Sequence, residues 1–231
     1  IVIGESRTGD ITQAYWIMGR SQTSRNRILV QEGNIVRTDL FDKTSDAATS
    51  LIIYNAMNIV KNVHVVSNGD QTDSIVESLK SDAHTDLEHA LLNRTYEPDA
   101  PNFTPRISGA SWLSRTADGM GVVTKASSKL SIIRKGVNVD SIRDTTTIPG
   151  YRGIGYCIHT YKGDGNPLPS FTGAPYPVPI GETADQTADL FWNVLNDENK
   201  VALVVKTIHF RSGEISYAIR NKLSAATTAT P

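Results

Sequence analysis

Residues 14–30 read AYWIMGRSQTSRNRILV, and the pattern of this stretch is the starting point for the fold. Two apolar runs flank a polar centre, which predicts a strand, a basic turn and a return strand. The turn contains Arg20, Arg25 and Arg27, and no Asp or Glu occurs between residues 11 and 31. A local charge of plus three is therefore concentrated in a chain whose net charge is minus one.

The arginine-rich turn has two interpretations. Guanidinium groups donate paired hydrogen bonds to phosphate oxygens and stay charged at any working pH. With Ser21 and Asn26 beside its arginines, the turn is typical of an anion pocket, above all for a phosphate ester. It is equally typical of a solvated loop whose arginines pair with distant carboxylates. The residues of the turn alone leave both interpretations open.

Strand-like runs continue on both sides of this stretch. We count about ten, mostly in hairpin-like succession, with helical periodicity from Thr72 and capping-box patterns at Thr85–Glu88 and Thr183–Gln186. This pattern predicts the α+β class, with two large antiparallel sheets whose outer faces are covered by helices. We expect one domain spanning residues 1–231, with a tail that frays after residue 223 and with residues missing upstream of the opening IVIG.

Composition bounds the function. A net charge of −1 and a pI near 6.6 argue against the broad basic face of a nucleic-acid binder. The apolar runs are far shorter than the roughly 20 residues of a membrane span. A single cysteine, Cys157, excludes an internal disulfide and is typical of a reducing compartment, so we expect a cytoplasmic protein. The five histidines have no metal-like spacing, and we expect no metal and no cofactor.

Other polar positions stand out against their surroundings. In Ser67–Asp70 a strand ends at an Asn-Gly turn before a helix, whose free amides suit an anion, although a simple helix cap is the stronger interpretation. Tyr54 and Asn55 interrupt an apolar run and need partners if buried, which fits an oxyanion donor or a structural hydrogen bond. Glu97 lies in a proline-stiffened segment, as a general base or as a surface partner of Arg106.

These stretches together resemble the archaeal-type IMP cyclohydrolase family, specifically its bacterial relatives. The resembling pieces are AYWIMGRSQTSRNR at 14–27, IIYNAMNIV at 52–60, VVSNGDQTDSI at 65–75, YEPDAPNFTPRISG at 96–109 and GYCIHTYKGDGNPLPSF at 155–171. The basic turn is two residues longer than in archaeal members, and the loop at 163–181 extends beyond them. The resemblance implies the fold of N-terminal-nucleophile hydrolases, a four-layer αββα sandwich.

The resemblance also implies a reaction, the closure of 5-formamidoimidazole-4-carboxamide ribonucleotide (FAICAR) to IMP in purine biosynthesis. It suggests Glu97 as base or proton relay, Tyr54 as donor to the formyl oxygen and Arg27 as a third catalytic residue. The substrate-binding set would be Arg20, Ser21, Arg25, Asn26, Asn55, Asn68, Gly69, Asp73, Thr104 and Arg106. Which arginine holds the 5'-phosphate and which acts at the formyl group is left open. The partners implied are this purine ribonucleotide and other copies of the chain, as a homo-oligomer.

Two alternatives remain beside the cyclohydrolase. An N-terminal-nucleophile amidohydrolase would need Cys, Ser or Thr at a processed N-terminus, whereas residue 1 here is Ile. A nucleotide-binding protein of the same fold without catalysis is the other, if the longer basic turn has lost the reaction geometry. No P-loop and no G-x-S-x-G motif occurs, so the chain offers no support for ATP hydrolysis or serine hydrolase chemistry.

Overall fold

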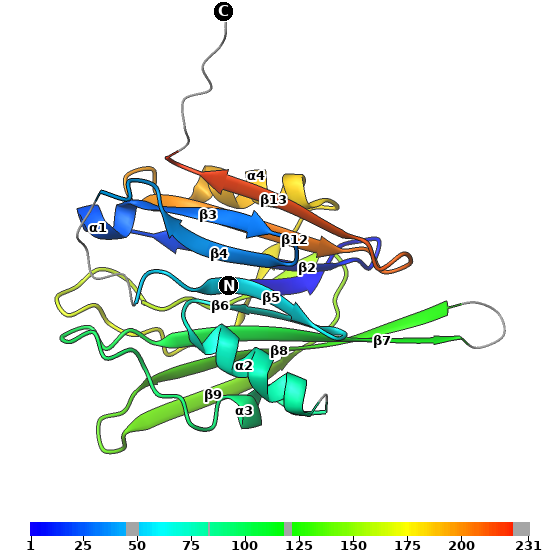
Figure 1. Ribbon diagram of the computed structural model, residues 1–231, viewed down its shortest axis with the longest axis horizontal. Coiled ribbons are helices and arrows are strands. Elements are labelled where there is room, and N and C mark those ends of the chain that lie inside the picture. Colours follow the sequence, from blue (N-terminus) through cyan, green and yellow to red (C-terminus); the bar gives the residue numbers. More distant parts are fainter. Residues whose placement is uncertain (45–50, 83, 118–121, 224–231) are drawn as a thin grey trace, which may run out of the picture.

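The computed structural model describes residues 1–44, 51–82, 84–117 and 122–223, which fold mainly into strands (Figure 1). The strands are β1 Val2–Glu5, β2 Ile11–Met18, β3 Arg27–Glu32, β4 Ile35–Leu40, β5 Asn55–Val60, β6 Val63–Ser67, β7 Arg106–Ala117, β8 Val122–Lys135, β9 Ser141–Ile148, β10 Ile154–Cys157, β11 Tyr176–Pro179, β12 Lys200–Ile208 and β13 Ile215–Asn221. The helices are α1 Gln22–Arg25, α2 Gln71–Ser81, α3 Leu87–Ala90 and α4 Ala184–Val194. The tail after residue 223, which we expected to fray, lies outside the described residues.

The described strands form two sheets. The first sheet has the order β11-β10-β1-β2-β12-β13, and the second has the order β3-β4-β5-β6-β7-β8-β9. Neighbouring strands pair antiparallel, from the short ladder of β1 with β2 to the long ladder of β7 with β8. The second sheet is a meander that follows chain order, whereas the first joins distant parts of the chain through the pairing of β2 with β12.

The stretch 14–30 crosses between the sheets, because β2 lies in the first sheet and β3 in the second. Our prediction of a return strand next to β2 is therefore wrong. Ser21 and Ser24 form a capping box in which each side chain accepts a hydrogen bond from the other residue's backbone N–H, both at 3.1 Å. This box closes the single turn of α1, and the turn redirects the chain toward the second sheet.

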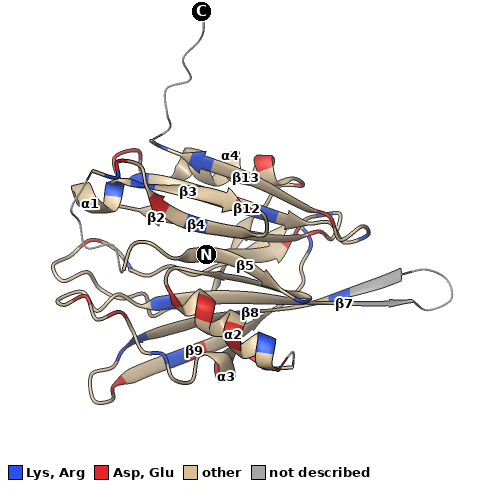
Figure 2. Cartoon of the chain, in the orientation of Figure 1, with Lys and Arg blue, Asp and Glu red and all other residues tan. Residues whose placement is uncertain are grey.

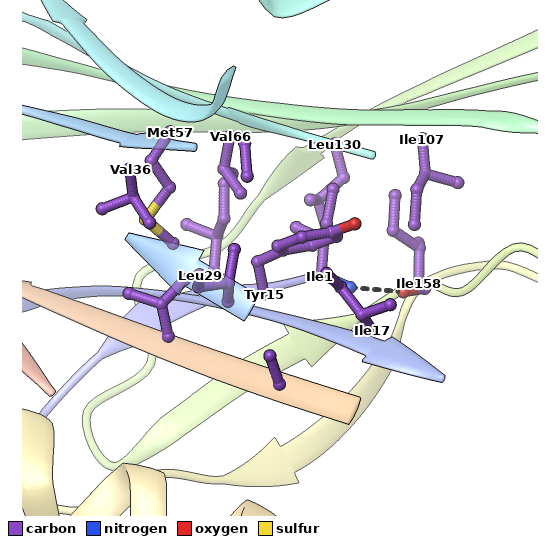
Figure 3. Close-up of a cluster of buried hydrophobic side chains, with 14 of the residues drawn as sticks. Ile1, Tyr15, Ile17, Leu29, Val36, Met57, Val66, Ile107, Leu130 and Ile158 are labelled. Carbon is purple, nitrogen blue, oxygen red and sulfur yellow. Dashed lines mark hydrogen bonds between the residues drawn. The ribbon is translucent and has the colours of Figure 1, made fainter. Parts of the chain in front are cut away.

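The inner faces of the two sheets pack on each other over an apolar core (Figure 3). Tyr15 and Ile17 of β2 face Val66 of β6 and Leu130 of β8 within this core. Close contact requires a glycine in β7, since a Cβ on Gly109 would lie 2.6 Å from the side chain of Ile3 in the first sheet. The packing of the two sheets therefore forms one buried core, and two further buried clusters lie where α4 and α2 pack on the outer faces.

The expected α+β class with a four-layer αββα sandwich is wrong, because the described chain is mostly antiparallel sheet. Helix α2 packs on β5, β6 and β7, and helix α4 packs on β12 and β13 (Figure 1). Each of these helices has 11 residues, and α1 and α3 have 4 residues each. An 11-residue helix is about 16 Å long, whereas the width of a seven-stranded sheet, measured across its strands, is about 29 Å. The helices therefore cover only part of each outer face.

Replacing Leu130 by Ala should lower the free energy of unfolding by about 2–5 kcal/mol, because it leaves a cavity between the sheets. Leu130 is 1% exposed. The matched control is Leu92→Ala, at a side chain that is 61% exposed, and it should change stability by less than about 0.5 kcal/mol. Urea denaturation measures both values, and equal losses would contradict the placement of Leu130 in the core.

Candidate active site

Four polar side chains singled out in the sequence are buried at one end of the fold. They are Arg27 at the start of β3, Tyr54 just before β5, Glu97 in the loop after α3 and Arg106 at the start of β7. Each is only 7–8% exposed. The charge of Arg27 acts on the pKa values of both Tyr54 and Glu97, so the four lie in one electrostatic cluster.

Glu97 is the carboxyl group of this cluster. Burial raises its pKa to about 7, while Arg106 lowers it and the carboxylates of Asp99 and Asp70 raise it further. The backbone N–H of Glu97 donates to the carbonyl of Thr104 at 2.9 Å, which ties down both ends of the loop. An acid that titrates near neutrality can both accept and return a proton during one reaction.

Gly69 makes room for this carboxyl group. A Cβ at this position would lie 3.1 Å from Glu97 Oε1, 3.0 Å from Arg106 NH1 and 2.6 Å from Gln71 Oε1. Arg106 NH1 donates to Asp70 Oδ1 at 2.5 Å and to Gln71 Oε1 at 2.7 Å. The Asn-Gly turn between β6 and α2 therefore brings an acid and a guanidinium together, which is a more specific role than a helix cap.

Tyr54 is paired with a residue that the sequence reasoning missed. Its hydroxyl lies 2.5 Å from the hydroxyl of Tyr15 on β2, and both side chains are buried. Burial raises the pKa of both phenols, although Arg27 opposes the shift at each. Both phenols therefore stay protonated at neutral pH and can donate hydrogen bonds. The signal available in the sequence was a second tyrosine inside a buried strand, which needs a partner.

The polar residues of the basic turn have three different roles: one arginine is buried, another is hydrogen-bonded to neighbouring groups, and two residues shape the turn. Arg27 alone is buried, and its Nε donates to the carbonyl of Ser24 at 2.9 Å. Arg25 is engaged by Gly19 and Asn199, to which it donates at 2.9 Å each. Ser21 caps α1, and the side chain of Asn26 exchanges two 2.8 Å hydrogen bonds with the backbone of Asp42, so both shape the turn.

Asn55, Asn68 and Asp73 lie on the elements around the cluster. Asn55 Nδ2 donates to Asp73 Oδ1 at 2.8 Å, which joins β5 to the first turn of α2. Asn68 donates to the carbonyl of Pro105 at 3.0 Å and accepts from the N–H of Ile107 at 2.9 Å. The amide of Asn68 is thus occupied in joining the end of β6 to the start of β7.

Thr104 brings a second overlooked tyrosine to the site. Its hydroxyl contacts the side chains of both Asp99 and Tyr161. Burial raises the pKa of Tyr161, and the charges of Glu97 and Arg20 also act on it. Arg20 is half-exposed, and its NH1 lies 3.7 Å from Asp164. Tyr161 therefore lies between the buried cluster and the exposed arginine at its rim.

The long Gly- and Pro-rich stretch at 163–181 is not a loop throughout, because β11 at Tyr176–Pro179 pairs with β10; the rest folds back on the chain beside this region. The N–H of Lys162 donates to the carbonyl of Pro169 at 2.8 Å, and Tyr161 bridges to Ser170. Residues Thr172 to Pro175 line a cavity of about 270 Å³ whose floor includes Leu130 and Ile132 of the shared core. The loop therefore closes the edge of the core near β8 and β9.

Positions of basic and of acidic residues both occur along the two sheets (Figure 2). Among the described residues, no cluster of His, Cys, Asp and Glu is suited to hold a metal ion. None of the described helices is long and apolar enough to cross a membrane.

A buried acid, phenol and guanidinium lie together at one end of two packed antiparallel sheets, an arrangement typical of enzyme sites for acid–base chemistry. The chain belongs to the family described as IMP cyclohydrolase-like protein, whose model matches residues 1–213. The IMP cyclohydrolase of Methanocaldococcus jannaschii is 27% identical over 213 residues, 90% of this chain and 91% of the relative. That of Methanocella arvoryzae is 30% identical over 142 residues, 60% of this chain and 67% of the relative.

Replacing Glu97 by Gln should make the protein more stable than wild type at pH 8 but not at pH 5. Because the folded-state pKa of Glu97 is raised to about 7, its contribution to stability is complete below the unfolded pKa near 4.5 and is lost as the pH rises through 7. The neutral amide avoids this loss, which is on the order of 2–4 kcal/mol.

Urea denaturation of wild type and variant at both pH values measures the effect. The matched control is Glu77→Gln on α2, whose side chain is 75% exposed, and its stability difference from wild type should not change with pH. A Glu97→Gln difference that is also constant with pH would show that Glu97 has an ordinary pKa.

Proposed function

We propose that this protein is an IMP cyclohydrolase that closes FAICAR to IMP with loss of water. Its membership of the family over residues 1–213 and its similarity to two archaeal IMP cyclohydrolases support this proposal. The observation that carries it is the buried Glu97, with a pKa of about 7, beside Tyr54 and Arg27. The substrate is a purine ribonucleotide, and the reaction belongs to purine biosynthesis.

Ring closure makes three demands on the site. The carboxamide nitrogen attacks the formyl carbon, so a C–N bond forms, an amide proton leaves and negative charge develops on the formyl oxygen. In the second half of the reaction that oxygen leaves as water, so it takes up two protons in all. One comes from the carboxamide nitrogen and the other from the formamide N–H, whose nitrogen forms the new C=N bond. An amide is a poor nucleophile, so the two arms must also be held in contact.

In this proposal Glu97 serves both halves of the reaction. As the carboxylate it removes the amide proton, and as the acid it returns a proton to the departing hydroxyl. A pKa of about 7 suits both directions at neutral pH. Glu97 carries the carboxamide proton, and the formamide N–H supplies the second proton of the water that leaves, so the reaction balances without an oxidant or a reductant.

Tyr54 and Arg27 stabilise the negative charge on the formyl oxygen. Burial raises the pKa of Tyr54, which keeps its O–H available as a donor, and the guanidinium of Arg27 supplies a fixed positive charge. Charge stabilisation of this kind is strongest where water is excluded, and both side chains are 8% exposed.

In this proposal the 5'-phosphate binds at the exposed rim of the buried cluster. Arg20 is half-exposed there and its charge acts on Tyr161, whereas Arg25 is engaged by Gly19 and Asn199. Thr104 and Asn55 would supply neutral contacts to the substrate between the rim and the buried cluster. Arg106 has hydrogen bonds to Asp70 and Gln71 and acts mainly by setting the charge around Glu97. The homo-oligomer suggested by the sequence stays a prediction.

The experiment that tests the function follows ring closure of FAICAR by absorbance with wild type and Glu97→Gln. Wild type should accelerate closure, and the variant should lose about 10²–10⁴-fold in kcat with little change in KM, because an amide neither takes nor returns the proton. Glu77→Gln serves as the control and should match wild type. Binding of FAICAR by wild type without acceleration would instead indicate a nucleotide-binding protein, and equal activity in Glu97→Gln would remove Glu97 from the mechanism.

Replacing Tyr15 by Phe should lower kcat about 10-fold while KM stays close to the wild-type value. The hydroxyl of Tyr15 lies 2.5 Å from that of Tyr54, and in the proposed mechanism it orients the Tyr54 O–H that donates to the formyl oxygen. The same absorbance assay measures the effect, with Tyr151→Phe, at a 59% exposed tyrosine, as the control. A rise in KM with unchanged kcat would contradict a positioning role for Tyr15.

A further inference from the structure

A layer of polar side chains lies between the two sheets, beyond Tyr15 on the side away from the candidate active site. In the first sheet, Lys206 of β12 pairs with Gln13 of β2 on one side and with Tyr217 of β13 on the other. In the second sheet, Ser111 of β7 pairs with His64 of β6 on one side and with Ser128 of β8 on the other. We call these six residues the polar layer: Gln13, His64, Ser111, Ser128, Lys206 and Tyr217.

The two rows of the polar layer face each other across the core. Gln13 Nε2 donates to the carbonyl of His64 at 3.0 Å and to the hydroxyl of Ser111 at 3.1 Å. The hydroxyls of Ser111 and Ser128 lie 2.8 Å apart. These contacts show that both rows point into the same space between the sheets.

Lys206 is the unusual member of the layer. Its side chain is 0% exposed, and its Nζ has no hydrogen-bond partner and no carboxylate partner among the described residues. Burial alone lowers its pKa to about 7. A buried ammonium group without an opposite charge is strongly unfavourable, so something must balance it or it must lose its proton.

The polar atoms left over in the layer are mostly donors. Within the described chain, Lys206 Nζ, the hydroxyl of Tyr217 and Nδ1 of His64 all lack partners, and Gln13 Oε1 is the one unpaired oxygen that can only accept. Burial and the nearby Lys206 lower the pKa of His64 to about 3, so its imidazole is neutral at pH 6 and can present an N–H. Such a surplus of buried donors around one cation suits an acceptor with one negative charge.

We propose that the polar layer binds a small inorganic monoanion of halide size, chloride in the cell, between Lys206, Tyr217 and His64. One ammonium group balances one negative charge. Ile11 and Ile208, paired on β2 and β12 and each 2% exposed, lie beyond Gln13 and Lys206 and offer no hydrogen-bond donors, which favours a monatomic ion over an oxyanion whose several oxygens each need a donor. The bound anion stabilises the packing of the two sheets and shares no residue with the reaction, so this proposal stands apart from the proposed function.

Thermal unfolding of wild type in sodium chloride and in sodium gluconate at equal ionic strength tests the proposal. Gluconate is a bulky organic anion, far larger than chloride, so it controls for general salt effects. At pH 6, where Lys206 is protonated, Tm should rise by about 3–5 °C for each tenfold increase in chloride above its dissociation constant, and it should not rise with gluconate. At pH 9 the specific effect of chloride should shrink, because the lysine loses its proton.

Variants assign the effect to the polar layer. Lys206→Met keeps the side-chain length and removes the charge, so it should abolish the chloride-specific rise, and Tyr217→Phe should reduce it. Lys80→Met, at a lysine that is 60% exposed, is the matched control and should keep the full rise. A wild type without a chloride-specific rise, or a Lys206→Met protein that retains it, would overturn the proposal.

A direct measurement does not depend on any variant folding. Crystals of the wild-type protein grown in sodium bromide should show an anomalous scattering peak within hydrogen-bond distance of Lys206 Nζ. Peaks only at the protein surface, with none between the sheets, would overturn the proposal as well.

Discussion

The exclusion of water from the space between two sheets is the constraint on which this structure depends. Apolar side chains satisfy it over most of the interface, where Tyr15, Val66 and Leu130 meet. Every polar group that enters the same space loses its hydration and must find a partner, a changed pKa or a ligand. The buried tyrosine pair, the near-neutral Glu97 and the polar layer around Lys206 are three outcomes of this one constraint.

The crossing between the sheets connects the fold to the candidate site. The chain leaves β2 just after Tyr15 and Ile17, turns through α1 and enters β3 at Arg27. The guanidinium of Arg27 is held from within the turn by the carbonyl of Ser24. Two residues later, the backbone of Leu29 exchanges hydrogen bonds of 2.8 and 3.0 Å with the side chain of Asn221 in the first sheet. Changes in the turn therefore move both a sheet edge and a buried charge.

The sequence predicted which polar side chains come together better than it predicted the architecture. Arg27, Tyr54, Glu97 and Arg106 were chosen because their stretches resemble a known family, and they lie in one cluster. The crossing at residues 14–30 was not predictable from its apolar flanks, because period-two alternation identifies a strand without identifying its sheet. The prediction of complete outer helical layers was wrong for a related reason. Periodicity indicates that a helix exists, but it does not indicate how much of a sheet the helix covers.

The residues that the sequence reasoning missed have roles that depend on partners in other strands. Tyr15 and Lys206 lie in the runs AYWIM and VALVVKTI, which are typical of buried strands, and only their partners on other strands give them a role. No alternation rule reports a partner that is 39 residues away, as Tyr54 is from Tyr15. Long-range pairing therefore limits what a single sequence can reveal about a site between sheets.

The arrangement around Arg106 explains why Glu97 keeps a high pKa although a guanidinium lies beside it. Burial opposes the ionisation of Asp70, but hydrogen bonds and charges from Arg94 and Arg106 outweigh it and lower the pKa of Asp70. The guanidinium of Arg106 therefore interacts chiefly with the carboxylate of Asp70, to which it donates a hydrogen bond at 2.5 Å. Its other hydrogen bond goes to the neutral side chain of Gln71. Glu97 then responds mainly to its own burial, so an acid with a near-neutral pKa can exist next to an arginine. The arginines thus stabilise the ionised form of Asp70 more than that of Glu97, which leaves Glu97 able to carry a proton at neutral pH.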